Sequence, residues 1–146
     1  MAETLKARMR EDLNNARRAR DKDRTTLLTT ILSDLKYREV ELGREATDAE
    51  VIDIVSKGIK RRREAAEQMR AGNRIDLAEK EEAEAAALSV YLPAQMSEAE
   101  VRSIIRQAID EGANTIGAVM GRIAPRIKGS FDGKEANRIA REMLGA

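Results

Sequence analysis

The chain has 146 residues with 27 basic and 26 acidic side chains, which leave a net charge of only +1 at pH 7. It contains neither cysteine nor histidine, so disulfides, thiolate zinc sites and nucleophilic systems of the Ser-His-Asp or Cys-His kind are excluded. Charged residues make up 36% of the chain and aromatic residues 2%, which favours aliphatic helices with charged outer faces over sheets. We therefore expect an all-α protein that holds no metal and no cofactor.

Four helices are predicted in the N-terminal part of the chain. Apolar residues recur at helical spacing over residues 5–16, 28–42, 47–71 and 75–92. Gly43 and Pro93 mark the ends of the second and fourth helices. Thr47 and Glu50 form a capping box at the start of the third. We expect these helices to form one region over residues 1–92.

Three shorter helices are predicted after Pro93. Their apolar stripes cover residues 97–109, 116–123 and 136–143. Ser97 and Glu100 form a capping box at the start of the first, and Pro125 is expected to end the second. Alternating apolar and polar residues, which would indicate strands, are missing. We therefore expect a three-helix C-terminal subdomain over residues 97–146, beside the four-helix N-terminal region.

The most informative stretch covers residues 113–141, where six basic residues against two acidic ones leave a local charge of +4. Its loop runs from Lys128 to Lys134 into a predicted helix start, where free backbone N–H groups and the positive end of the helix dipole attract phosphate. The loop glycines allow a ligand to approach the backbone. We predict a nucleic-acid contact at Arg122, Arg126, Lys128, Gly129, Gly133, Lys134, Arg138 and Arg141.

Purely structural interpretations of this stretch stay open. Asp132 followed by Glu135 is typical of a capping box that closes the helix start by itself. Phe131 is expected to hold the loop against the core rather than to stack on a base. Gly117 and Gly121, four residues apart on one helix, predict a close approach by a neighbouring helix.

A second basic run begins in the third predicted helix with Lys57, Lys60, Arg61, Arg62 and Arg63, and continues further on with Arg70 and Arg74. The simplest interpretation is a solvated helix face, with RNA binding as the alternative. The fourth predicted helix carries the acidic residues Glu79, Glu81, Glu82 and Glu84. We expect these glutamates to pair with the basic third helix rather than to form a catalytic pair of carboxylates.

The sequence also bears on the compartment. No apolar run approaches the roughly 18 to 20 residues that would span a bilayer, and the arginine-rich N-terminus lacks the apolar stretch of a secretory signal. Such an N-terminus is also typical of organellar transit peptides, although these rarely contain acidic residues such as Glu3, Glu11 and Asp12. We therefore expect a cytoplasmic protein.

Two segments carry a family resemblance: residues 59–101, which include the Tyr91-Leu92-Pro93 hinge, and the C-terminal segment that starts at Gly117. Through them nearly the whole chain resembles the YqeY family of small bacterial proteins. The C-terminal module of that family is similar to the tail of GatB, the tRNA-contacting subunit of the amidotransferase that converts misacylated Glu-tRNA(Gln) or Asp-tRNA(Asn). The resemblance implies tRNA as a ligand and, at family level, carbon–nitrogen ligation with glutamine as amide donor.

The residues do not support that ligation as an autonomous activity. The chain has no recognisable nucleotide site, no cysteine nucleophile and no Ser-Ser-Lys amidase signature. We expect a non-catalytic protein whose C-terminal subdomain binds tRNA or an aminoacyl-tRNA-processing complex. One rival is a protein-interaction adaptor that docks its partner through the basic third helix or the N-terminal hairpin. Another is participation in amide transfer as part of a larger complex.

Overall fold

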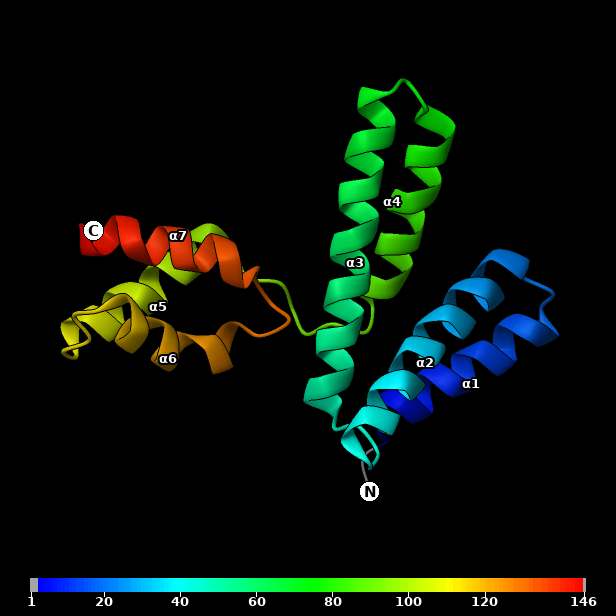
Figure 1. Ribbon diagram of the computed structural model, residues 1–146, viewed down its shortest axis with the longest axis horizontal. Coiled ribbons are helices and arrows are strands. Elements are labelled where there is room, and N and C mark those ends of the chain that lie inside the picture. The colour runs from blue at the N-terminus through cyan, green and yellow to red at the C-terminus, as the bar shows by residue number, and fades with distance from the viewer. Residues whose placement is uncertain (1–2, 146) are drawn as a thin grey trace. The chain divides into compact units, whose positions relative to one another are not determined.

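The computed structural model describes residues 3–145, and over that range it contains seven α-helices and no strand. The chain divides into two compact units, Met1–Leu92 (unit 1) and Pro93–Ala146 (unit 2). Unit 1 contains α1 (Leu5–Arg18), α2 (Lys22–Leu42), α3 (Asp48–Ala71) and α4 (Ile75–Ser89) (Figure 1). Unit 2 contains α5 (Glu98–Asp110), α6 (Ile116–Ile127) and α7 (Gly133–Leu144). The predicted all-α class is confirmed.

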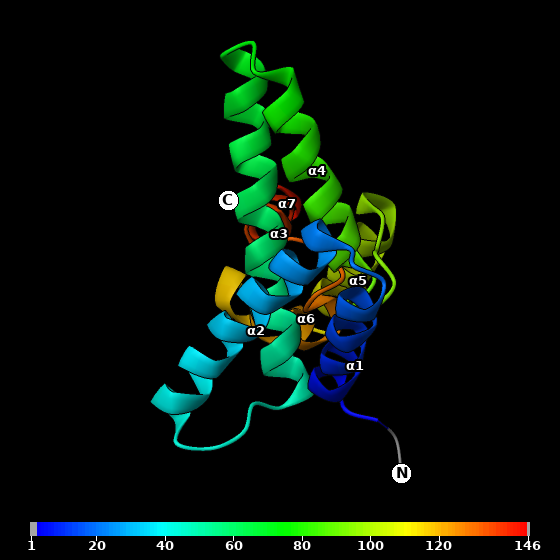
Figure 2. The same cartoon turned by 90° about the vertical axis from the view of Figure 1, so that its right-hand side faces the viewer.

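Unit 1 is built from two antiparallel hairpins, α1–α2 and α3–α4, whose helices lie side by side in both ribbon views (Figures 1 and 2). The buried side chains that they share are almost all aliphatic: Met9, Leu13, Leu27, Leu28, Ile31, Leu35, Val51, Val55, Ile59, Ala85, Leu88 and Tyr91. A Cβ atom on Gly58 would come within 3.0 Å of Ile31 Cδ1. The missing side chain at Gly58 therefore lets α3 approach α2 closely.

Most helix ends follow the predicted local signals. The capping boxes at Thr47 and Ser97 are both present. Gly43 ends α2 in the left-handed conformation, with φ of +69°. The sixth helix is longer than predicted, because it continues through Pro125 to Ile127. A proline this close to the helix end removes one hydrogen bond, and burial of Ile123 and Ile127 offsets the loss.

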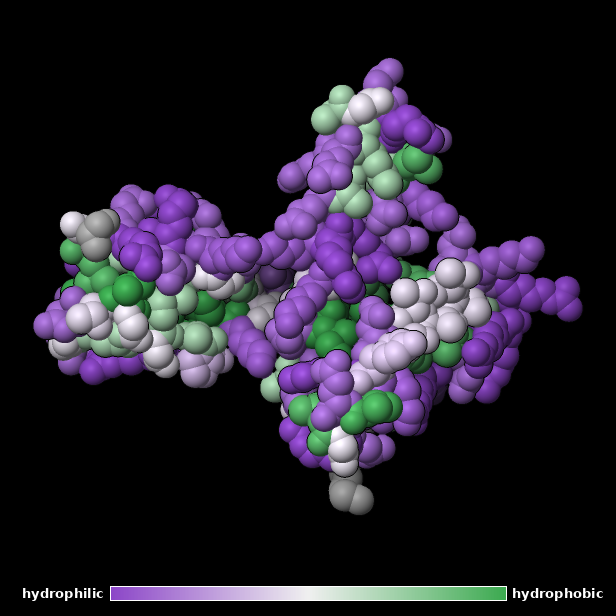
Figure 3. All heavy atoms as spheres, viewed as in Figure 1, coloured by the Kyte–Doolittle hydropathy of each residue, from purple (hydrophilic) through white to green (hydrophobic). Residues whose placement is uncertain are grey.

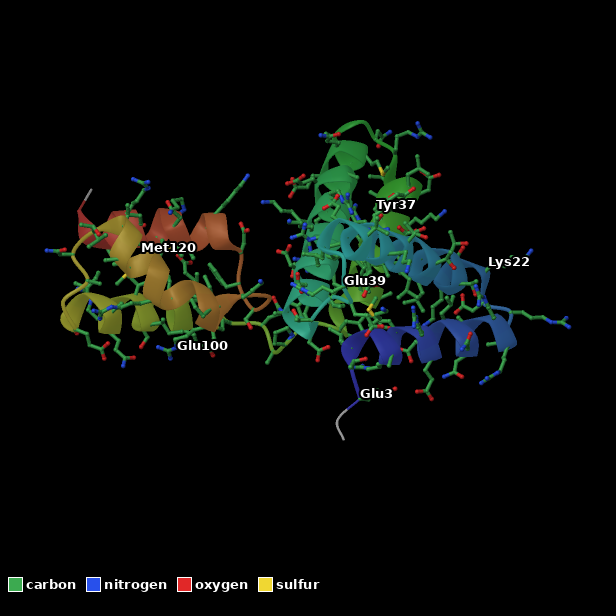
Figure 4. The ribbon with its side chains drawn as sticks, turned by 60° about the horizontal axis from the view of Figure 1, so that its bottom comes forward. Glu3, Lys22, Tyr37, Glu39, Glu100 and Met120 are labelled. Carbon is green, nitrogen blue, oxygen red and sulfur yellow. The ribbon has the colours of Figure 1, made fainter. Side chains whose placement is uncertain are left out.

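A buried ion pair joins the start of α1 to the end of α2. Lys6 Nζ lies 2.8 Å from Glu39 Oε2, and the Ala46 amide donates to the same oxygen at 2.8 Å. Only 7% of Glu39 is exposed, and its position on α2 is labelled in Figure 4. The hydrogen bonds from Lys6 and then Ala46 hold the pKa of Glu39 below its ordinary value. The carboxylate thus connects α1, α2 and the loop that follows α2.

Tyr91 anchors the last turn of unit 1 to its first two helices. The buried Tyr91 hydroxyl donates to Asp12 Oδ2 at 2.5 Å, and the Arg8 guanidinium lies 5.2 Å from the ring centroid. Asp12 also pairs with Arg24 at 3.9 Å. Burial, with the nearby Asp12 carboxylate, raises the pKa of Tyr91 to about 12. The tyrosine therefore stays a neutral donor throughout the ordinary pH range.

Unit 2 packs its three helices around a second aliphatic core. Its buried members are Val101, Ile104, Ile105, Ala108, Ala113, Val119, Ile123, Ile127, Ala136, Ile139 and Ala140. The predicted close approach at Gly117 and Gly121 is wrong, because a Cβ atom at either position would meet nothing within 4 Å. The buried residues of α6 are Val119 and Ile123, each two residues after one of these glycines. The glycines therefore lie on the solvent side of the helix.

The ion pair between Lys6 and Glu39 predicts a large cost for removing one partner. Glu39→Ala should lower the free energy of unfolding by about 3 kcal/mol, because the Lys6 ammonium is left without its main partner. Urea unfolding followed by circular dichroism measures this change. Lys6→Ala/Glu39→Ala should recover part of the loss, and strictly additive single losses would contradict the coupling.

The same ion pair predicts a pH dependence whose sign follows from the lowered pKa of Glu39. A carboxylate with a lower pKa in the folded protein stabilises it fully above the ordinary value of 4.5, and the contribution disappears as the pH falls below that value. The Glu39→Ala protein should therefore lose less stability than the natural protein between neutral and acid pH. Parallel losses would contradict the assignment.

Candidate nucleic-acid interface

The turn between α6 and α7 has a backbone shape that depends on Gly129. Its φ angle is +76°, in the left-handed region where a side chain is disfavoured. The Ser130 and Phe131 amides both donate to the Ile127 carbonyl, at 2.8 Å and 3.0 Å. Lys128 is the C-cap of α6, with φ of −55° and ψ of 122°, and so leaves the helical conformation. The chain thus reverses within a few residues and exposes the cations on both sides of the turn.

Two residues that begin unit 2 hold this turn in place. The Gln95 side-chain amide donates to the Gly129 carbonyl at 2.7 Å, and the Met96 backbone amide donates to the Ser130 carbonyl at 2.8 Å. Ser130 is 6% exposed, and the partly buried Phe131 packs against the core of unit 2, which confirms its predicted role. These contacts were not found by sequence reasoning, because more than thirty residues separate the partners.

The capping box predicted at Asp132 and Glu135 is wrong. The Asp132 side chain makes no cap hydrogen bond to α7, and Glu135 accepts instead from Arg138. The hydrogen bond from Arg138 lowers the pKa of Glu135, and Glu135 raises the pKa of Arg138. The first N–H groups of α7, which have no acceptor within the helix, are therefore not covered by a capping side chain.

The predicted phosphate-binding cations divide into two groups. Arg122 pairs with Glu111 at 3.5 Å. Arg138 is surrounded by three acids, Glu98, Glu135 and Glu142. Arg141 donates to the Asn137 side chain at 2.9 Å. By contrast, Arg126, Lys128 and Lys134 are exposed, and none of the three has an ion pair within residues 3–145. The structure places these three, with Gly129 and Gly133, around one turn.

The basic run on α3 is largely neutralised by neighbouring acids. Arg62 pairs with Glu84 at 3.1 Å and Arg70 with Glu82 at 2.6 Å, both across the α3–α4 hairpin. Arg61 pairs with Asp34 of α2 at 3.4 Å. The expectation that the acidic fourth helix pairs with the basic third is confirmed for Glu82 and Glu84. The simpler interpretation of the run, a charged helix face, fits this pairing.

Between residues 3 and 145, no cluster of three or more histidine, cysteine, aspartate or glutamate side chains has the arrangement of a metal site. In that same part of the chain no helix has both the length and the apolar character needed to cross a membrane.

Comparison with known proteins gives a family match over almost the whole chain. The family model described as Yqey-like protein matches residues 6–144. An uncharacterized protein of Schizosaccharomyces pombe is 37% identical over 93 residues, 64% of this chain and 76% of the relative. The Altered inheritance of mitochondria protein 41 of Pyrenophora tritici-repentis is 29% identical over 95% of this chain and 80% of its own. Its namesake in Lachancea thermotolerans is 32% identical over 72% of this chain and 58% of its own.

The predicted cytoplasmic location is contradicted by these comparisons, because two of the relatives are named as mitochondrial proteins. The physical reason for the error is that amino-acid composition does not determine subcellular location. The arginines of α1 lie on the outer side of a helix whose apolar residues Met9, Leu13 and Ala16 are buried. Their pattern thus reports helix packing and says nothing about compartment.

The two glycines of the turn predict opposite effects of the same substitution. Gly129→Ala should lower the stability of unit 2 by about 1 kcal/mol, because alanine is strained at a positive φ. Gly133→Ala should be neutral or slightly stabilising, since its Cβ would meet nothing within 4 Å and alanine favours the helix. Thermal unfolding of both variants measures the difference, and equal effects would contradict this description of the turn.

Proposed function

The chain belongs to the YqeY-like protein family, and from that premise we propose that unit 2 binds the phosphate backbone of tRNA through Arg126, Lys128 and Lys134. The single observation that carries the proposal is the lack of an acidic partner for these three exposed cations within the described residues, at one turn of a nearly neutral protein. A cation without an intramolecular partner keeps its full attraction for an external phosphate, because no ion pair must first be broken.

The backbone supports the same proposal. The start of α7 lacks a side-chain cap, so its free N–H groups and the positive end of its dipole lie beside Lys134. The nearby acid Glu135 is occupied by Arg138, which reduces its repulsion of a phosphate. Hydrogen bonds from Gln95 and Met96 to the Gly129 and Ser130 carbonyls hold the turn in one conformation. Little conformational entropy is therefore lost when a ligand binds.

The proposed ligand class is tRNA because the C-terminal module resembles the tail of a tRNA-contacting amidotransferase subunit. In this proposal the chain positions tRNA, and any amide transfer is carried out by other proteins. The sequence contains neither cysteine nor histidine, the residues that most often serve as nucleophile or general base. The names of the fungal relatives support a place of action in mitochondria.

Salt-dependent tRNA binding tests the proposal. Lys128→Gln/Lys134→Gln should weaken binding of bulk tRNA and reduce the slope of log affinity against log salt by about two, because two phosphate contacts are lost. Arg122→Gln/Arg141→Gln removes the same charge from two cations that have intramolecular partners, and its effect on the slope should be clearly smaller. Fluorescence anisotropy at several salt concentrations measures both variants.

Two outcomes would contradict the tRNA proposal. One is an unchanged salt slope in the Lys128/Lys134 variant, and the other is an equal effect of the Arg122/Arg141 control. Duplex DNA of matched charge serves as the competitor, since equally strong DNA binding would reduce the site to a general polyanion contact.

A protein-interaction adaptor remains the second candidate, because one surface of unit 1 has the character of a protein contact. Tyr37 and Val40 on α2 are 75% and 70% exposed, and Figure 4 labels Tyr37. A groove of about 260 Å3 is lined by Tyr37, by Ile54 of α3 and by five charged side chains. Four of these charged side chains are paired within the protein, Arg38 with Glu41 and Arg61 with Asp34. Exposed apolar side chains next to charges that are already paired favour a protein contact at this surface.

Nuclease treatment before affinity capture separates the two candidates. An association through RNA should disappear, whereas a direct protein contact should survive and should be lost in Tyr37→Ser/Val40→Ser. Val90→Ser, which changes another exposed apolar residue of unit 1, is the matched control. Loss of capture in that control would argue against a specific role for the α2 surface.

A further inference from the structure

The turn between α1 and α2 contains an arginine in an unusual backbone conformation. Arg20 has a φ angle of +57°. Its amide donates to the Arg17 carbonyl at 3.1 Å, and the next amide, of Asp21, donates to the Ala16 carbonyl at 3.0 Å. This hydrogen-bond pattern is the Schellman motif, in which the left-handed residue after the helix is usually glycine. The backbone therefore holds Arg20 at the outer end of the hairpin.

The other left-handed positions of the chain follow the usual preference. They are Gly43, Asn73, Gly112, Gly129 and Gly145. Among residues 3–145, Arg20 alone is neither glycine nor asparagine at such a position. A side chain other than these is disfavoured there because its Cβ crowds the backbone. The protein therefore keeps a cation where glycine would be more stable, which is the kind of local cost that accompanies functional sites.

The cations around Arg20 are not used inside the protein. Arg17, Arg20 and Lys22 are exposed, and their side chains make no ion pair or hydrogen bond with any other residue in the described part of the chain. Figure 4 shows Lys22 at the outer end of the α1–α2 hairpin. Of the two acids in this turn, Asp21 accepts from the Arg24 amide and caps α2, while Asp23 is exposed. Residues 17–24 carry five basic and two acidic side chains.

We propose that the α1–α2 turn is a second polyanion-binding site, located on unit 1, which contacts the phosphate backbone of RNA through Arg17, Arg20 and Lys22. RNA is favoured over an anionic membrane because peripheral membrane sites combine cations with exposed apolar side chains. Among residues 3–145, the large apolar side chains that are exposed are Tyr37, Val40, Ile75 and Val90, and none of them belongs to the turn. The side chains that project at this end of the hairpin are hydrophilic in Figure 3.

This site shares no residue with the turn of unit 2, so each can be tested separately in the full-length chain. Arg20→Gly removes the positive charge and also the unfavourable free energy of a side chain at a left-handed φ angle. It should raise the Tm by about 4 °C, lower the affinity for bulk tRNA about five-fold near physiological salt and reduce the salt slope by about one. Greater stability together with weaker binding is a result that a merely structural turn would not give.

Three variants serve as controls for Arg20→Gly. Asn73→Gly relieves a left-handed residue without removing charge, and its binding should stay unchanged. Lys36→Gln removes one exposed charge of α2 outside the turn, and should change binding much less. Arg17→Gln/Lys22→Gln removes two charges of the turn without touching its backbone, and should reduce the salt slope by about two.

The possible results separate this inference from the proposal for unit 2. Unchanged binding by Arg20→Gly, or an equal loss in Lys36→Gln, would overturn the second site. If Lys128→Gln/Lys134→Gln binds normally while Arg20→Gly does not, the second site stands and the unit 2 site fails. A membrane contact would be favoured instead if the protein bound phosphatidylcholine–phosphatidylserine vesicles more strongly than tRNA, and if Arg20→Gly weakened vesicle binding but left tRNA binding unchanged. That result would also overturn the inference.

Discussion

Charge pairing between neighbouring helix faces is the constraint on which the surface of this protein depends. The chain carries 27 basic and 26 acidic residues, so packing decides which cations find an acid. Pairs such as Arg62–Glu84 and Arg70–Glu82 connect α3 with α4, although exposed pairs contribute little stability. Their greater consequence is for binding, because a paired cation is already neutralised. The exposed cations of the two turns, which have no ion pair within residues 3–145, are therefore among those available to an external polyanion.

The interior uses few polar groups, and several of them connect elements that are distant in the sequence. Leucine, isoleucine and alanine faces leave helix register loosely specified, because many alignments bury similar apolar area. In unit 1 the Lys6–Glu39 pair and the bond from Tyr91 to Asp12 select one alignment. In unit 2 the bond from Met96 to Ser130 has the same effect at the turn. Buried polar groups thus provide specificity that an aliphatic core lacks.

The two basic turns share the same structural features although they belong to different units. Each combines a left-handed residue, Arg20 or Gly129, with exposed cations that have no internal acid. In the proposed binding mode either turn alone would offer only a few phosphate contacts, and a site of that size binds weakly at physiological salt. Two weak sites on one chain can reinforce each other, because binding at the first raises the effective concentration of the second. This arrangement suits a folded RNA better than a small anion.

The sequence by itself determined the features that arise from neighbouring residues: the helices, the capping boxes at Thr47 and Ser97, and the basic excess of residues 113–141. These depend on backbone hydrogen bonds and spacing within a few residues, which a sequence displays directly. Only the tertiary structure decided that Arg122 pairs with Glu111 and Arg138 with Glu98, while Lys128 and Lys134 have no ion pair within residues 3–145. Ion pairing requires side chains within about 4 Å, and for several of these pairs the acid comes from another helix or turn. The φ angle of Arg20 was decided in the same way, by the geometry with which α2 returns along α1.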